Sequence, residues 1–111
     1  MNGVPTVPIQ QVPDPLPAGL HVLDVREEAE WRHGHIDGAT HIPLGDLPAR
    51  VSAVSDEQTL VVCRIGGRSA RAVAYLRQRG HDAVNLDGGM LDWEAAGRPM
   101  VSETGEAPRV V

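Results

Sequence analysis

The chain is poor in reactive and aromatic side chains: among its 111 residues there is one cysteine, Cys63, and neither lysine nor phenylalanine. A lone cysteine forms no disulfide within its own chain, which leaves catalysis, metal binding or packing as its uses and fits a reducing compartment. No apolar run approaches the ~18 residues of a membrane span, and no basic segment followed by an apolar one marks a secretory signal. We therefore expect a cytoplasmic protein with no membrane partner.

Aromatic residues make up 3% of the chain, so the core has to be built from valine, leucine, isoleucine and alanine. Such residues suit buried strands that are covered by helices. The net charge of -5 at pH 7 argues against nucleic acid as a partner. The length predicts a single domain over residues 1–111, with an extended, proline-rich start at 1–19 and a C-terminal tail at 101–111 whose composition suggests that it is loose.

Apolar runs typical of strands alternate along the chain with segments that carry helix signals. The strongest helix signal lies at 68–79, where a broad apolar stripe is followed by Gly80 as a stop. We predict strands at 6–9, 21–25, 40–42, 59–63 and 83–86, and helices at 27–33, 45–54, 68–79 and 88–96. This alternation predicts an α/β fold with a central parallel sheet of about five strands covered by helices on both faces.

The cysteine lies where a strand is expected to run into a helix, in the segment LVVCRIGGRS at 60–69. In open α/β sheets, ligands bind beyond the carboxyl ends of the strands. The next helix begins near Gly67 or Arg68, so its unpaired amides point back toward the loop. Gly66 and Gly67 lack side chains and let the backbone curl with its amides facing inward, which is an arrangement that stabilises an anion such as the Cys63 thiolate.

Magnitudes indicate which groups stabilise such a thiolate. A thiol with a pKa near ~8.5 is about 3% ionised at neutral pH, and lowering the pKa by roughly two units takes about 2.7 kcal/mol. A helix dipole supplies about 0.3 to 1 kcal/mol, whereas a charge-assisted N–H bond supplies about 1.5 to 3. We therefore expect loop amides to dominate and the arginines to help attract substrate. The alternative is an inert, packed cysteine at the end of a buried strand.

Four blocks span nearly the whole chain in a fixed order: LDVRE at 23–27, GHIDGATHIPLGDL at 34–47, VVCRIGGRS at 61–69 and LDGGMLDW at 86–93. In these blocks the sequence resembles the single-domain rhodanese-like sulfurtransferases. The resemblance implies a rhodanese-like three-layer fold in which Cys63 accepts a sulfane sulfur atom. It also implies a thiosulfate sulfurtransferase that passes this sulfur from a small anionic donor to cyanide or a thiol, without a cofactor.

The length of the cysteine loop separates two activities within similar folds. Relatives with Cys-x5-Arg are phosphatases or arsenate reductases, and those with a loop one residue shorter are sulfurtransferases. Here Arg68 gives Cys-x4-Arg, and Ser69 stands at the phosphatase spacing. The resemblance therefore favours sulfur transfer over a cysteine-based phosphatase or arsenate reductase. A persulfide carrier that feeds an acceptor protein and a non-catalytic interaction module of the same fold also stay open.

The resemblance assigns roles around the loop. The Cys63 persulfide is expected to face the backbone of the active loop, and two arginines of that loop, Arg64 and Arg68, are expected to bind the oxygens of thiosulfate. A solvated helix start or a pair with an acidic residue is the structural alternative for these arginines. Asp24 and Arg26 are expected to brace the loop from behind, although an ordinary turn carboxylate explains Asp24 equally well. The helix start at 88–89 is expected to pack beside the loop. The residues assigned to the active loop are Arg64, Ile65, Gly66, Gly67, Arg68 and Ser69.

Three histidines, His33, His35 and His41, raise the question of zinc. A closed zinc site needs four ligands, and neither Cys63 nor the remaining histidines stand at a recognisable ligand spacing. The GHIDGA segment instead matches a turn of the family. We therefore expect no metal site.

Overall fold

The computed structural model describes residues 3–111, and within them the chain forms one five-stranded parallel sheet with the order β1-β5-β4-β2-β3. This confirms the expected α/β architecture. The strands are β1 (Thr6–Val7), β2 (His21–Asp24), β3 (Thr40–His41), β4 (Thr59–Val62) and β5 (Ala83–Leu86). The α-helices are α1 (Glu28–His33), α2 (Leu47–Arg50), α3 (Gly67–Gln78) and α4 (Gly89–Ala95), and the 3-10 helices are η1 (Ile9–Gln11), η2 (Leu44–Asp46) and η3 (Val51–Ala53).

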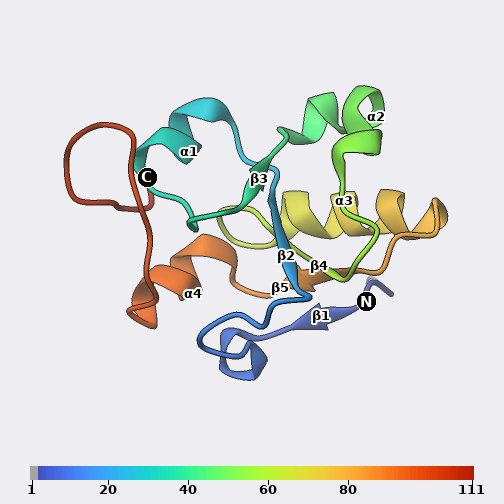
Figure 1. Ribbon diagram of the computed structural model, residues 1–111, viewed down its shortest axis with the longest axis horizontal. Coiled ribbons are helices and arrows are strands. Elements are labelled where there is room, and N and C mark those ends of the chain that lie inside the picture. The colour runs from blue at the N-terminus through green and yellow to red at the C-terminus, as the bar shows by residue number, and fades with distance from the viewer. Residues whose placement is uncertain (1–2) are drawn as a thin grey trace.

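The sheet divides the core into two halves, and its central strand β4 contributes side chains to both. Because side chains alternate along a strand, Leu60 and Val62 pack on one face of the sheet and Val61 on the other, where Cys63 continues the pattern. The face that carries Cys63 is covered by α2 and α3, and the opposite face by α4 (Figure 1). The sheet therefore delivers the cysteine to the side on which the long helix α3 begins.

The predicted helix at 45–54 is wrong as a single element. The segment instead forms three short pieces in succession, η2, α2 and η3. Pro48 lies in the first turn of α2 and has no amide to donate, and the β-branched Val51 and Val54 are poor helix formers. The first strand is also shorter than predicted, because Pro8 precedes η1 and ends the pairing after Val7.

The C-terminal tail, suggested by its composition to be loose, makes specific backbone contacts with the domain. Val101 forms an antiparallel bridge with His35, and the Arg109 amide donates to the carbonyl of His33. The chain therefore returns to the end of α1, where Figure 1 shows the C-terminus beside that helix. This approach is close: a Cβ atom on Gly34 would lie 2.5 Å from the Arg109 carbonyl oxygen.

No helix within residues 3–111 combines the length and the apolar character required to cross a membrane.

Replacing Gly34 with alanine is expected to push the tail off α1, because the new methyl group meets backbone that cannot rotate away. Overpacking of this kind lowers the free energy of unfolding by about 1–3 kcal/mol. Limited proteolysis followed by mass spectrometry should then show faster cleavage near Arg109. The matched control is Gly45→Ala, since a Cβ atom at Gly45 meets no atom within 4 Å. Equal cleavage rates in the two variants would contradict the close packing of the tail.

Candidate functional site

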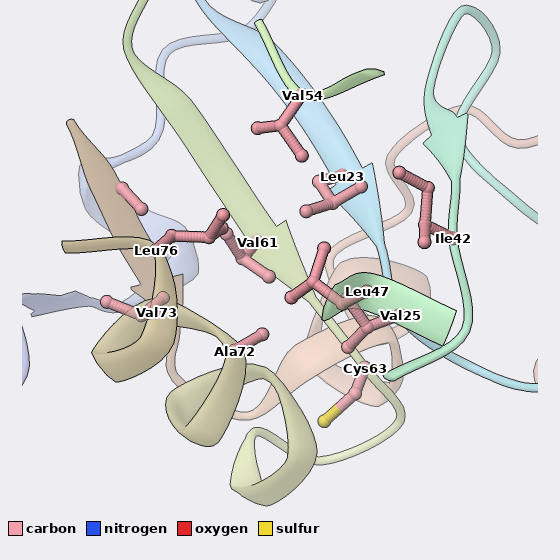
Figure 2. Packing of buried hydrophobic residues seen from close by; sticks show 11 residues of the cluster. Leu23, Val25, Ile42, Leu47, Val54, Val61, Cys63, Ala72, Val73 and Leu76 are labelled. Carbon is pink, nitrogen blue, oxygen red and sulfur yellow. The ribbon is translucent and has the colours of Figure 1, made fainter. Parts of the chain in front are cut away.

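Cys63 lies immediately after β4, at the point where the chain turns toward α3. The residue is only 1% exposed and belongs to the core cluster formed with Leu47 and Ala72. Figure 2 shows its sulfur pointing away from the aliphatic side chains and toward the loop that leads into α3. The sulfur therefore lies at the floor of the loop, between the hydrophobic core and the start of α3.

Two donors of the loop reach this sulfur. The Gly66 amide donates to Cys63 Sγ at 3.1 Å, and the Ser69 hydroxyl oxygen lies 3.3 Å from it. Gly66 has a φ of 117°, which is a conformation that residues with a side chain rarely adopt. Gly67 is the first residue of α3, which agrees with the expected helix start. Its lack of a side chain is not required for the curl, however, because a Cβ atom there would meet nothing within 4 Å. The curl of the loop thus depends on Gly66.

The balance of these contacts favours the thiolate. Burial raises the pKa of the Cys63 thiol, whereas the Ser69 hydroxyl and the backbone amides of Ser69, Gly66 and Ile65 lower it, and the net pKa lies below that of an ordinary thiol. The sequence predicted the contribution of the amides. It did not predict that the hydroxyl of Ser69 is the largest contribution that lowers the pKa.

The first turn of α4 holds the outer part of the loop. The Met90 amide donates to the carbonyl of Cys63 at 2.8 Å, and the Leu91 amide donates to that of Arg64 at 3.1 Å. These are free N–H groups of a helix start, and here they bind loop carbonyls. With its carbonyls held outward in this way, the loop keeps its own amides directed inward.

Arg68, in the first turn of α3, is bound by an acidic residue of α1. Its two terminal nitrogens donate to the two carboxylate oxygens of Glu30 at 2.8 and 2.9 Å. This bidentate pair lowers the pKa of Glu30 and raises that of Arg68. Arg68 also interacts electrostatically with Cys63. The sequence analysis missed Glu30, and its only local signal is its place in a capping box with Glu27 at the start of α1.

Arg64 and Ile65 form the exposed rim of the loop. The Arg64 guanidinium donates through Nε to the carbonyl of Val111 at 3.0 Å, so the tail reaches the loop. The Ile65 side chain is 60% exposed, which is unusual for a large apolar residue beside a buried cysteine.

Asp24 and Arg26 form a fully buried ion pair at the end of β2. Arg26 Nη2 lies 2.7 Å from the Asp24 carboxylate and also donates to the Gly34 carbonyl at 2.7 Å. Asp24 stands opposite Val62 in the sheet, one residue before the cysteine. The side chains of the pair thus tie the end of β2 to the end of α1, and β2 in turn borders the strand that carries Cys63.

A second residue that the sequence analysis missed is Asn85 on β5. It is 4% exposed, and its side-chain oxygen lies 2.5 Å from the Ser69 hydroxyl oxygen. An amide in the apolar strand AVNL is the only sequence signal for it, and that signal does not name its partner.

The three histidines considered for zinc each bind a backbone carbonyl. His33, His35 and His41 pair with the carbonyls of Ala29, Trp31 and Arg26, respectively. Between residues 3 and 111, the structure gathers no group of three or more histidine, cysteine or acidic side chains in a geometry that suits a metal ion.

Comparison with known proteins agrees with this fold. A family model described as Rhodanese-like domain matches residues 9–96. The chain is 38% identical over 81 residues to the putative sulfurtransferase YtwF of Bacillus subtilis, which covers 72% of this chain and 79% of that protein. It is 36% identical over 91 residues to the thiosulfate sulfurtransferase GlpE of Pseudomonas paraeruginosa, which covers 80% and 82%.

A solved structure extends the similarity to almost the whole chain. The crystal structure of a rhodanese-like domain protein from Staphylococcus aureus matches with a TM-score of 0.76 at 28% identity, and the match covers 96% of this chain and 99% of that one. The chain therefore belongs to the rhodanese-like sulfurtransferase family.

Proposed function

We propose that the protein is a thiosulfate sulfurtransferase that works through a persulfide on Cys63. The observation that carries this proposal is the cysteine itself, with its sulfur 3.1 Å from the Gly66 amide, 3.3 Å from the Ser69 hydroxyl oxygen and a lowered pKa. A thiolate is the nucleophilic form of cysteine, and this loop favours it. The five-position spacing from Cys63 to Arg68, which the family associates with sulfur transfer, supports the same assignment.

The first half-reaction forms the persulfide. The Cys63 thiolate attacks the outer sulfur of thiosulfate, the S–S bond of thiosulfate breaks, and sulfite leaves with the bonding electron pair. The terminal sulfur of the persulfide then carries negative charge within reach of the inward-facing amides of the loop. Those amides stabilise it as they stabilise the thiolate.

The second half-reaction returns the enzyme to its starting state. A nucleophile such as cyanide or a thiolate attacks the terminal sulfur, the persulfide S–S bond breaks, and the Cys63 thiolate leaves with the electron pair. The two substrates react in separate steps, so we expect ping-pong kinetics.

Two arginines at the loop are proposed to receive the dianionic donor. Arg68 is fixed by Glu30, and a guanidinium has five N–H donors, so the pairing still leaves donors for an anion. Arg64 lies on the exposed rim, where its hydrogen bond to the Val111 carbonyl leaves its other nitrogens available. Glu30 holds Arg68 in place, but its negative charge also partly offsets the attraction of Arg68 for the donor.

The acceptor in the cell is proposed to be a thiol, either a small molecule or a side chain of a protein. The exposed Ile65 next to the exposed Arg64 gives the rim an apolar contact that a protein partner can cover. A compartment that keeps thiols reduced, such as the cytoplasm, suits a catalyst that depends on a free cysteine.

Incubation with thiosulfate is expected to increase the intact mass of the protein by one sulfur atom, and cyanide is expected to remove this atom. Mass spectrometry measures both steps directly, because Cys63 is the only cysteine in the chain. The Cys63→Ser variant should gain nothing, and sulfate in place of thiosulfate should leave the wild type unchanged.

Absence of any mass gain in folded wild type would contradict the proposed function. Release of phosphate from an aryl phosphate by the same sample would favour a phosphatase instead.

Replacing Arg68 with glutamine is expected to lower kcat/KM for thiosulfate by roughly tenfold or more, because a charge-assisted contact to the donor is lost. In the single variant, the Glu30 carboxylate loses its partner, and this is a second cause of a lower kcat/KM. The Glu30→Gln/Arg68→Gln double variant removes that carboxylate and should still show most of the loss. Steady-state kinetics with cyanide as acceptor measures the effect. The matched control is Arg71→Gln, an exposed arginine one turn further along α3. Equal kcat/KM values for the Arg68 and Arg71 variants would argue against a donor-binding role for Arg68.

A further inference from the structure

The Ser69 hydroxyl has one proton and three acceptors within reach. Its oxygen lies 2.5 Å from Asn85 Oδ1, 3.2 Å from the Gly66 carbonyl and 3.3 Å from Cys63 Sγ. A hydroxyl donates one hydrogen bond at a time, so it cannot serve the sulfur and the amide oxygen together. The shortest of the three contacts is the one with Asn85.

The Asn85 side chain can offer Ser69 either a hydrogen-bond acceptor or a hydrogen-bond donor. An asparagine side chain presents an acceptor oxygen and a donor nitrogen of nearly the same shape, which exchange places by rotation about the last side-chain bond. Asn85 is 4% exposed and Ser69 is fully buried, so water does not readily replace either group. Asn85 Nδ2 also lies on the loop side, 3.8 Å from where a Cβ atom of Gly66 would be.

We propose that Asn85 is a positioning residue for Cys63, which acts through the Ser69 hydroxyl and turns its amide according to the charge on the sulfur. This inference rests on the proposed function only in that Cys63 is taken as the reacting group. In the thiol form, Cys63 S–H donates to Ser69 Oγ, and Ser69 O–H donates to Asn85 Oδ1.

In the thiolate form, the direction of the chain is reversed. The thiol proton passes to a base in solution, Ser69 O–H turns to donate to the sulfur, and Asn85 Nδ2 turns to donate to Ser69 Oγ. Ser69 keeps its proton throughout. Because hydrogen bonds in a chain strengthen one another, donation from Asn85 makes Ser69 a better donor to the thiolate.

The other charged or polar groups of the site have fixed partners and are not part of this chain of hydrogen bonds. Arg68 on α3 is held by Glu30 of α1, and at the end of β2 Arg26 is bound to Asp24 and to the Gly34 carbonyl. The start of α4 presents the amides of residues 90 and 91 to loop carbonyls. On β5, the side chain that reaches Ser69 is the uncharged amide of Asn85.

The test is a titration of Cys63 in four variants, measured by the ultraviolet absorbance of the thiolate and by the pH dependence of alkylation. Asn85→Asp supplies an acceptor that holds the Ser69 proton, and it is expected to raise the pKa of Cys63 by about one unit or more, the size of one charge-assisted hydrogen bond. Asn85→Leu keeps the branching of the side chain but neither holds nor repels the Ser69 proton. In this variant the pKa of Cys63 should therefore move by less than half of the shift expected in Asn85→Asp.

A double-variant comparison separates this chain from simple charge repulsion. Ser69→Ala alone should also raise the pKa of Cys63, and adding Asn85→Asp to it should cause less than half of the shift that the aspartate causes beside Ser69. An undiminished shift in the Ser69→Ala background, or an unchanged pKa in Asn85→Asp, would overturn the proposal.

A measurement on the wild type covers the case in which the buried aspartate prevents folding. The side-chain amide NMR signals of Asn85 should move at the midpoint of the Cys63 titration, and by less than half as much in Ser69→Ala. Signals that stay fixed in the wild type would overturn the proposal. Sulfur uptake from thiosulfate is scored separately, so a protein that shows the expected pKa order but takes up no sulfur would refute the proposed function and leave this inference standing.

Discussion

The hydrogen bond from the Gly66 amide to the Cys63 sulfur is the contact around which the rest of the structure is arranged. It forms because β4 ends and α3 begins within five residues, so the free amides of a helix start face the end of a buried strand. Gly66 alone in the loop takes up the left-handed conformation that makes this turn possible. The start of α4 then binds the outward carbonyls, which fixes the loop from the other side.

Local sequence signals were sufficient for the sheet and for the position of the cysteine. The strands β2, β4 and β5 contain short apolar runs, and each of these runs is recognisable without knowledge of its neighbours in space. The loop was predictable because its determinants, Gly66 and a helix start, lie within seven consecutive residues. Segment 45–54 failed for the opposite reason: its proline and β-branched residues break one helix into three short pieces, and the signals for each piece are weak.

The residues that the sequence analysis missed all act across long separations in the chain. Glu30 binds Arg68 from 38 positions away, and Asn85 meets Ser69 from 16. Nothing in the local sequence names either partner, because the contacts exist only after α1 and β5 have packed beside α3. The Ser69 hydroxyl is a different case, because Ser69 lies six positions from Cys63 and was assigned to the active loop, but the contact of its hydroxyl with the sulfur was not predicted. A close approach of two backbones, as between Gly34 and Arg109, likewise has no signature in composition.

The path of the C-terminal segment has a practical consequence for the handling of this protein. Residue 111 touches Arg64, so anything fused after it, such as an affinity tag or a fluorescent reporter, begins at the mouth of the cysteine loop. Such an appendage would crowd incoming molecules and bring its own charges close to the sulfur. Purification handles are better attached ahead of β1, which lies at the edge of the sheet with two strands, β5 and β4, between it and β2.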